Sequence, residues 1–65
     1  MKNPMHIHIR RKLKSAAKVL DEALLFTGSL ETTPQTLQCL ANIRLALKKT
    51  ERAQGVLTLI EESEA

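Results

Sequence analysis

The sequence predicts an all-α chain, an antiparallel hairpin of two helices, and three observations support this fold class. Apolar residues recur at the three- and four-residue steps of an amphipathic helix over about residues 9–27 and again over about 34–62. A short polar stretch separates the two segments, and helices joined by about six residues must run antiparallel. Phe26 is the sole aromatic residue, so a core would consist of Leu, Ile, Val and Ala, which suits packed helices better than a sheet.

The first helix is expected to end at Gly28, because glycine is the favoured residue for a left-handed helix stop. Residues 1–8 precede it as a flexible or partly ordered lead-in. A short strand is the alternative there, since apolar and polar residues alternate from residue 5 to residue 10. The predicted apolar stripe of this helix is Ile9, Leu13, Ala16, Leu20, Ala23 and Thr27, widened by Ala17 and Leu24.

The second helix begins after a clear start signal, with Thr33 as N-cap and Pro34 at the first helical position. Gly55 lies near its end and marks either a bend or a close approach of another backbone. Residues 63–65 follow as an acidic tail. The predicted stripe is Cys39, Ile43, Ala46, Thr50, Ala53, Leu57 and Ile60, widened by Leu40 and Leu47, with Leu37, Val56 and Leu59 partly off it.

This apolar band is broader than one neighbouring helix can cover. A loop centred near residue 31 would place Ile9 beside Arg52 and Leu13 beside Lys48, so the second helix would extend about ten residues, roughly 15 Å, beyond the first. We therefore expect a partner chain, or self-association into a four-helix arrangement; the alternative is that residues 1–8 fold over this part of the second helix. Leu57→Asp in this overhang should abolish the complex and leave the hairpin largely helical. The residues expected to bind the partner are Leu37, Leu40, Ile43, Leu47, Val56, Leu57 and Ile60.

The basic residues fall in two blocks, from Lys2 to Lys18 and from Arg44 to Arg52. Antiparallel packing is expected to bring both blocks to the same end of the hairpin, with the acidic tail just beyond them. Convergent cations bind phosphates, so a small basic helical or ribbon-helix-helix-like nucleic-acid-binding regulator is the alternative function, less favoured because aromatics for base stacking are scarce. The expected charged rim is Arg10, Arg11, Lys14, Arg44, Lys48 and Arg52.

The sequence carries no sign of catalysis, metal binding or a cofactor. It has no Gly-rich phosphate loop, no nucleophile motif and no evident carboxylate pair, so we expect no enzyme. His6, His8 and Cys39 do not make a four-ligand zinc pattern. The single cysteine fits a reducing compartment, no run approaches the length of a membrane span, and no cleavable secretion signal is evident. We expect a cytoplasmic protein.

Three local patterns resemble a known family. Pro34, Gln35, Leu37 and Gln38 give a Pro-Gln-x-apolar-Gln helix start; Ala46 and Leu47 are followed by Glu51; and small and aliphatic residues fill positions 53–60. Over about residues 11–62, the chain resembles the small co-chaperones of type III secretion needle subunits, the group that includes YscE, PscE, SsaE and EscE. The resemblance implies a non-enzymatic protein of the bacterial cytoplasm that pairs with a larger tetratricopeptide-like chaperone. Together the two would keep a needle subunit soluble and unpolymerised before export.

Overall fold

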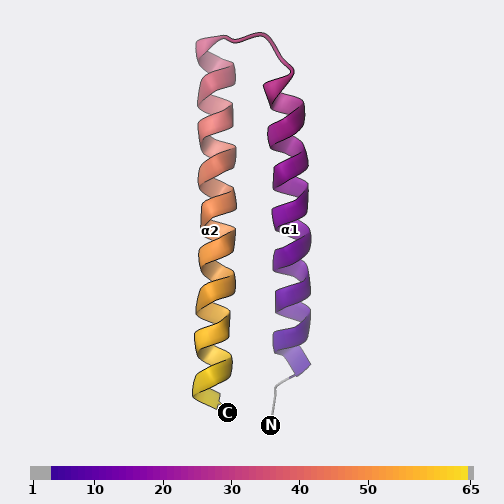
Figure 1. Cartoon of the computed structure of the whole chain (residues 1–65), viewed down its shortest axis with the longest axis vertical. Helices are drawn as coiled ribbons and strands as arrows, with labels where there is room; N and C mark the ends of the chain where they lie inside the picture. Colours follow the sequence, from indigo (N-terminus) through magenta and orange to yellow (C-terminus); the bar gives the residue numbers. More distant parts are fainter. Residues whose placement is uncertain (1–3, 65) are drawn as a thin grey trace.

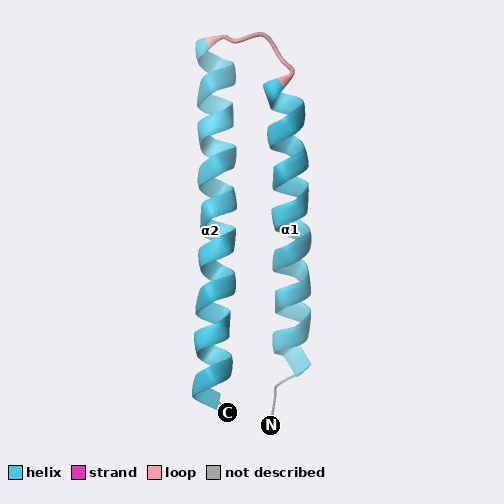
Figure 2. Ribbon diagram, viewed as in Figure 1, coloured by secondary structure: helices cyan, strands magenta, loops and turns pink. Residues whose placement is uncertain are grey.

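The computed structural model describes residues 4–64, which form two long helices packed side by side (Figure 1). Helix α1 spans Pro4–Gly28 and helix α2 spans Pro34–Glu64. The helices run antiparallel, residues 29–33 join them, and both ends of the chain lie at the same end of the hairpin (Figure 2). The predicted all-α helical hairpin is therefore confirmed.

The start of α2 is the one that the sequence predicts. The backbone N–H of Thr36 donates a hydrogen bond to the Thr33 hydroxyl at 3.1 Å, and the N–H of Leu37 donates to the Thr33 carbonyl at 3.0 Å. The first bond satisfies one of the backbone donors that the first turn of a helix leaves without a partner, and the second is the first regular hydrogen bond of the helix. Thr33 is thus the N-cap residue, and Pro34 follows at the position where its missing N–H has no consequence.

Helix α1 ends at the predicted residue, but the backbone geometry of this end differs from the predicted one. Gly28 does not have a positive φ, so the expectation of a left-handed stop is wrong. The last turn tightens instead: the N–H of Ser29 donates to the Phe26 carbonyl at 3.2 Å, and the N–H of Leu30 donates to the Thr27 carbonyl at 3.1 Å. Such bonds across three residues satisfy carbonyls that the end of an α-helix leaves open.

Helix α1 also begins earlier than residue 9, the start that its periodicity indicated. Residues 4–8 are helical, so the strand alternative is wrong for this segment, and residues 1–3 of the predicted lead-in lie outside the described residues. Pro4 suits a first helical turn. The side chains of His6 and Arg10 find polar partners on α2, so packing against α2 overrides the alternating pattern of the sequence.

The two helices meet along one stripe on each, and we call these residues the seam. Its members are buried or half-buried and recur at alternating steps of four and three, the pattern of an antiparallel coiled-coil pair. Leu57 is the one buried hydrophobic residue among those described, with 5% of its surface exposed. The seam consists of His6, Arg10, Leu13, Ala17, Leu20, Leu24 and Thr27 on α1, and Thr36, Leu40, Ile43, Leu47, Thr50, Gln54, Leu57 and Glu61 on α2.

The predicted register, with Ile9 beside Arg52, is wrong. The Arg10 guanidinium donates to the Thr58 hydroxyl at 3.1 Å and pairs with the Glu61 carboxylate. The first turns of α1 therefore pack along the last turns of α2, and the predicted overhang does not exist. At the loop end, Figure 1 shows α2 rising beyond the end of α1.

Helix α2 runs through Gly55 without a break, so the predicted bend is absent, and so is a close approach of another part of the described chain. A Cβ atom built at Gly55 would meet nothing within 4 Å. Gly55→Ala should therefore raise the free energy of unfolding by about 1 kcal/mol, the difference in helix propensity between the two residues. Urea denaturation followed by circular dichroism measures this change. A loss of stability would contradict the open, regular helix described for this position.

Candidate protein-binding surface

The hairpin exposes more surface than a compact chain of its size, and many large hydrophobic residues lie on that surface. Within residues 4–64, twelve large hydrophobic residues are exposed and one is buried. The radius of gyration is 15.2 Å, whereas a compact domain of this length has about 11 Å. The accessible surface is 5260 Å², about 1,100 Å² above the roughly 4,200 Å² expected of a compact 7.3 kDa protein. This excess is surface that water meets in the isolated chain.

Much of this apolar surface lies on one side of the hairpin. Two antiparallel helices are related by an approximate two-fold axis that is perpendicular to the plane containing both helix axes. This rotation does not exchange the two sides of the plane, so equivalent positions of the two helices lie on the same side of the hairpin. On each helix, the residues directly before the seam positions lie on one flank of the seam, and they therefore share one side of the hairpin. We call it the apolar side: Met5, Ile9, Ala16, Val19, Ala23 and Phe26 of α1, with Cys39, Ala46, Ala53, Val56 and Ile60 of α2.

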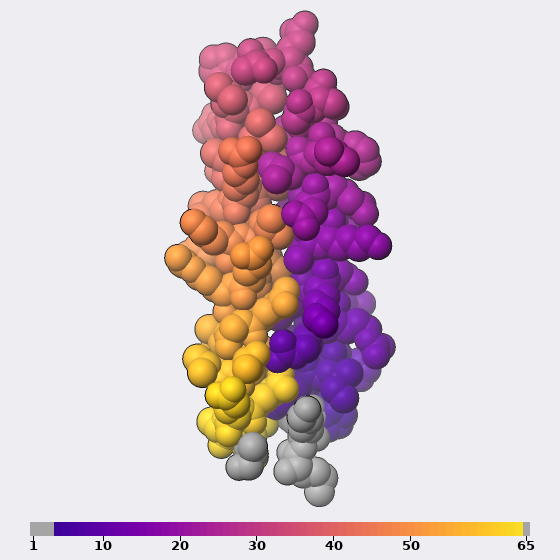
Figure 3. Space-filling view, in the orientation of Figure 1, coloured from indigo at the N-terminus to yellow at the C-terminus, as the bar shows by residue number. Residues whose placement is uncertain are grey.

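A hollow in the surface supports this assignment. Leu20 of α1 lines it together with Cys39, Asn42 and Ala46 of α2, so the small residues of α2 border the seam on the side where Leu20 approaches. Lys12 and Lys49 are the charged residues at the helix positions of this side within residues 4–64, and none there is acidic. The apolar side is thus a long hydrophobic strip with two cations at its margins. Figure 3 shows one face of the elongated molecule, in which atoms of the two helices meet along most of their length.

The opposite side mixes apolar and charged residues. Ile7 lines a hollow with Arg11 and Lys14, and Leu45 lines another with Arg44 and Lys48. Leu25 likewise lies beside Asp21. We call this the charged side, because charged groups interrupt its exposed hydrophobic residues.

The predicted charged rim is divided between two places. Arg10, Arg11 and Lys14 line one hollow with Glu61, while Arg44 and Lys48 line a different one; Arg52 is exposed. At Arg10 the expected meeting of the two basic blocks is wrong, because the acidic end of α2 lies there.

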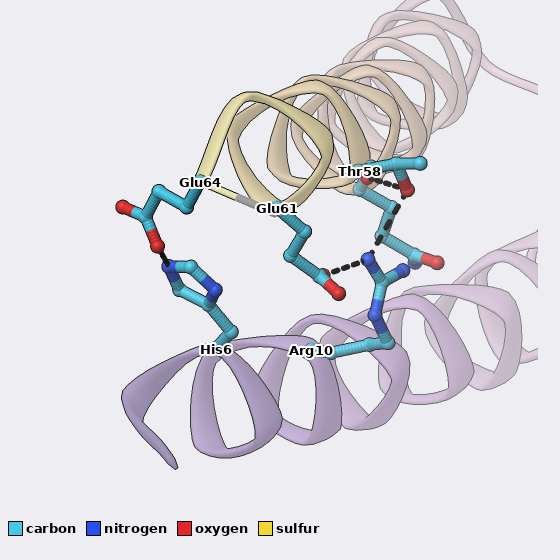
Figure 4. A network of polar contacts seen from close by, with 6 residues as sticks. His6, Arg10, Thr58, Glu61 and Glu64 are labelled. Atoms are coloured by element: carbon cyan, nitrogen blue, oxygen red, sulfur yellow. Dashed lines mark hydrogen bonds and ion pairs between the residues drawn. The ribbon is translucent and has the colours of Figure 1, made fainter. Parts of the chain in front are cut away.

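The start of α1 and the end of α2 are joined by a cluster of polar side chains (Figure 4). Besides the Arg10 contacts with Thr58 and Glu61, Nε2 of His6 lies 3.3 Å from a carboxylate oxygen of Glu64. The Thr58 hydroxyl in turn donates to the Gln54 carbonyl at 3.2 Å. His6 is buried, and its Nδ1 atom has no hydrogen-bond partner among the described residues. We call His6, Arg10, Thr58, Glu61 and Glu64 the terminal polar cluster; it closes the open end of the hairpin.

The seven predicted partner-binding residues separate into two groups. Leu40, Ile43 and Leu47 are half-buried and Leu57 is buried, all in the seam, so they pack on the sister helix. The other three are exposed: Leu37, Val56 and Ile60.

The sequence prediction did not identify the contribution of α1 to the apolar side. Met5, Ile9, Val19 and Phe26 are exposed on it. Met5 and Ile9 are four residues apart and Val19 and Phe26 are seven apart, which is helical spacing. That stripe lies one position before the seam, however, and the periodicity merged the two. The ribbon-helix-helix-like alternative is wrong as a fold, because residues 4–64 form no strand. Between residues 4 and 64, no cluster of three or more His, Cys, Asp or Glu side chains could hold a metal ion.

Neither described helix combines the length and hydrophobicity needed to cross a membrane. Comparison with protein-family models, curated proteins and solved structures found no significant match to this chain.

Proposed function

We propose that this chain is a non-enzymatic protein-binding stabiliser, whose apolar side is covered by another polypeptide. The observation that carries the proposal is the exposed strip of Ile9, Val19, Phe26, Val56 and Ile60 on a hairpin with a very small interior. Apolar surface of this extent on a small protein marks an interaction site. A surface formed by two helices lying side by side suits a partner built of helices, because helices pack by fitting side-chain ridges into grooves.

The resemblance to needle-subunit co-chaperones gives this partner a specific form. In that role the chain stabilises a tetratricopeptide-like chaperone in the bacterial cytoplasm and, through it, helps to keep a type III secretion needle subunit soluble and unpolymerised. The charges of the apolar side add a requirement on the partner. Since Lys12 and Lys49 are its charged residues, a fitting groove is apolar at its centre and carries carboxylates at its rim.

A binding experiment with a matched control tests the proposal. The chain is titrated with a tetratricopeptide-like needle chaperone, and its melting temperature and heat of binding are measured. A partner at one hundred times its dissociation constant adds about 2.7 kcal/mol to the stability, which raises the melting temperature of a chain this short by about 10 °C or more.

Val56→Asp on the apolar side should weaken binding by at least about tenfold, because it buries a carboxylate without a partner. Leu45→Asp is the control, since Val56 and Leu45 are each 55% exposed and Leu45 lies on the charged side. No rise in melting temperature would refute the proposed partner class. Equal weakening by the two substitutions would refute the assignment of the apolar side.

A further inference from the structure

We propose that, in the absence of another partner, a second copy of this chain covers the apolar side, so that two hairpins form a four-helix bundle. The inference concerns the chain alone and does not depend on the identity of any partner. If the proposed function holds as well, the second copy and the partner compete for the same side.

The area of excess surface fits such a dimer. A standard protein interface buries about 800 Å² on each partner, and the isolated hairpin exposes about 1,100 Å² more than a compact protein of its mass. Pairing two copies along their apolar sides removes an area of this order from each. In a four-helix bundle every helix packs on two neighbours, whereas each helix of the isolated hairpin packs on one.

The shape of the apolar side suits an identical side. Small residues occupy the positions that border the seam, at Ala16, Ala23, Ala46 and Ala53, so the axis of a second hairpin can approach closely. Larger residues lie toward the two ends of the strip, with Met5 and Ile60 at the open end of the hairpin and Phe26 at the loop end. Each helix carries two of these alanines seven residues apart, so a second copy presents two helices with matching spacing of small residues.

The charges permit this pairing and exclude the other side. No carboxylate occupies the helix positions of the apolar side, so none is buried when two copies meet there. Lys12 and Lys49 lie at its margins, where long side chains can cover apolar surface and keep their ammonium groups in water. Pairing along the charged side would instead remove charged groups such as Arg11, Lys14 and Asp21 from water, which costs free energy.

The mass of the chain in solution tests the proposal. Sedimentation equilibrium of the wild-type chain, from about 1 μM to about 1 mM, should show the mass rising from 7.3 kDa to twice that value. Phe26→Glu should raise the dissociation constant of the dimer at least about tenfold. Leu25→Glu should leave it unchanged. The two residues are sequence neighbours with 67% and 73% of their surface exposed, so neither change should unfold the hairpin. If Phe26→Glu nevertheless loses its helical circular dichroism, Val19→Glu on the same side replaces it.

The native thiol of Cys39 provides a second measurement, because it is exposed in the single chain and lies on the apolar side. Its reaction with a thiol reagent should slow as the wild-type concentration rises and stay fast in Phe26→Glu. A wild-type chain that remains at 7.3 kDa over the whole range would refute the proposal. So would a dimer that Leu25→Glu dissociates and Phe26→Glu leaves intact.

Discussion

Replacing Leu57 by Ala should unfold most of the chain under mild conditions. Leu57 is the buried hydrophobic residue of the seam, and its loss should cost about 2–4 kcal/mol, from lost burial and from the cavity left behind. A chain of this length has a total stability of only about 3–10 kcal/mol. Urea denaturation followed by circular dichroism should show the midpoint falling sharply, or the helical signal already reduced without urea.

The neighbouring residue supplies the control for this prediction. Val56 is exposed on the apolar side, so Val56→Ala should change the stability of the isolated hairpin by less than about 0.5 kcal/mol. A loss from Leu57→Ala as small as that from Val56→Ala would contradict the position of Leu57 in the seam. The same position corrects the expectation for Leu57→Asp: a carboxylate there should unfold the hairpin, whereas an overhang would have tolerated it.

Replacing Arg10 by Ala should open the end of the hairpin at which the terminal polar cluster lies. The guanidinium bridges Thr58 and Glu61, and the side chains of Arg10 and Glu61 are only 31% and 18% exposed. Its removal takes this cation from a largely buried carboxylate, so we expect a loss of about 1–2 kcal/mol, between the values for exposed and buried pairs. Amide hydrogen exchange should show the faster exchange concentrated in the first turns of α1 and the last turns of α2.

Arg11→Ala is the matched control, because Arg11 is exposed one residue further along α1. It removes the same charge and similar side-chain volume and should change stability by less than about 0.5 kcal/mol. Equal effects of the two substitutions would mean that net charge, rather than the contacts of Arg10, determines the stability of this end.

Two features at the open end could not be predicted from the sequence because they depend on contacts between distant residues. Periodicity selects apolar positions, so it passed over His6, Arg10, Gln54 and Glu61 as seam residues. These polar side chains lie in the seam because His6 and Arg10 find partners on the other helix. The register followed the same contacts, and a loop assumed to be symmetric about residue 31 gave the wrong one.

The sequence also could not determine which of two neighbouring apolar stripes packs in the seam. On α2, Cys39, Ala46 and Ala53 form one apolar stripe, and Leu40 and Leu47 begin another one position later. Both have helical spacing, and periodicity alone does not rank them. In the folded hairpin the leucines occupy the seam and the smaller residues face outward, since larger side chains bury more apolar surface in the one interface available.

By itself, the sequence determined what local interactions control. The apolar spacing predicted two helices, Thr33 and Pro34 predicted the start of α2, and Gly28 predicted where α1 ends but not the geometry of that end. Tertiary structure alone decided the register, the early start of α1, and which apolar residues are left outside the seam. Those features depend on which side chains meet between the two helices. Such contacts join residues that are far apart in the sequence, so local sequence patterns do not determine their free energy.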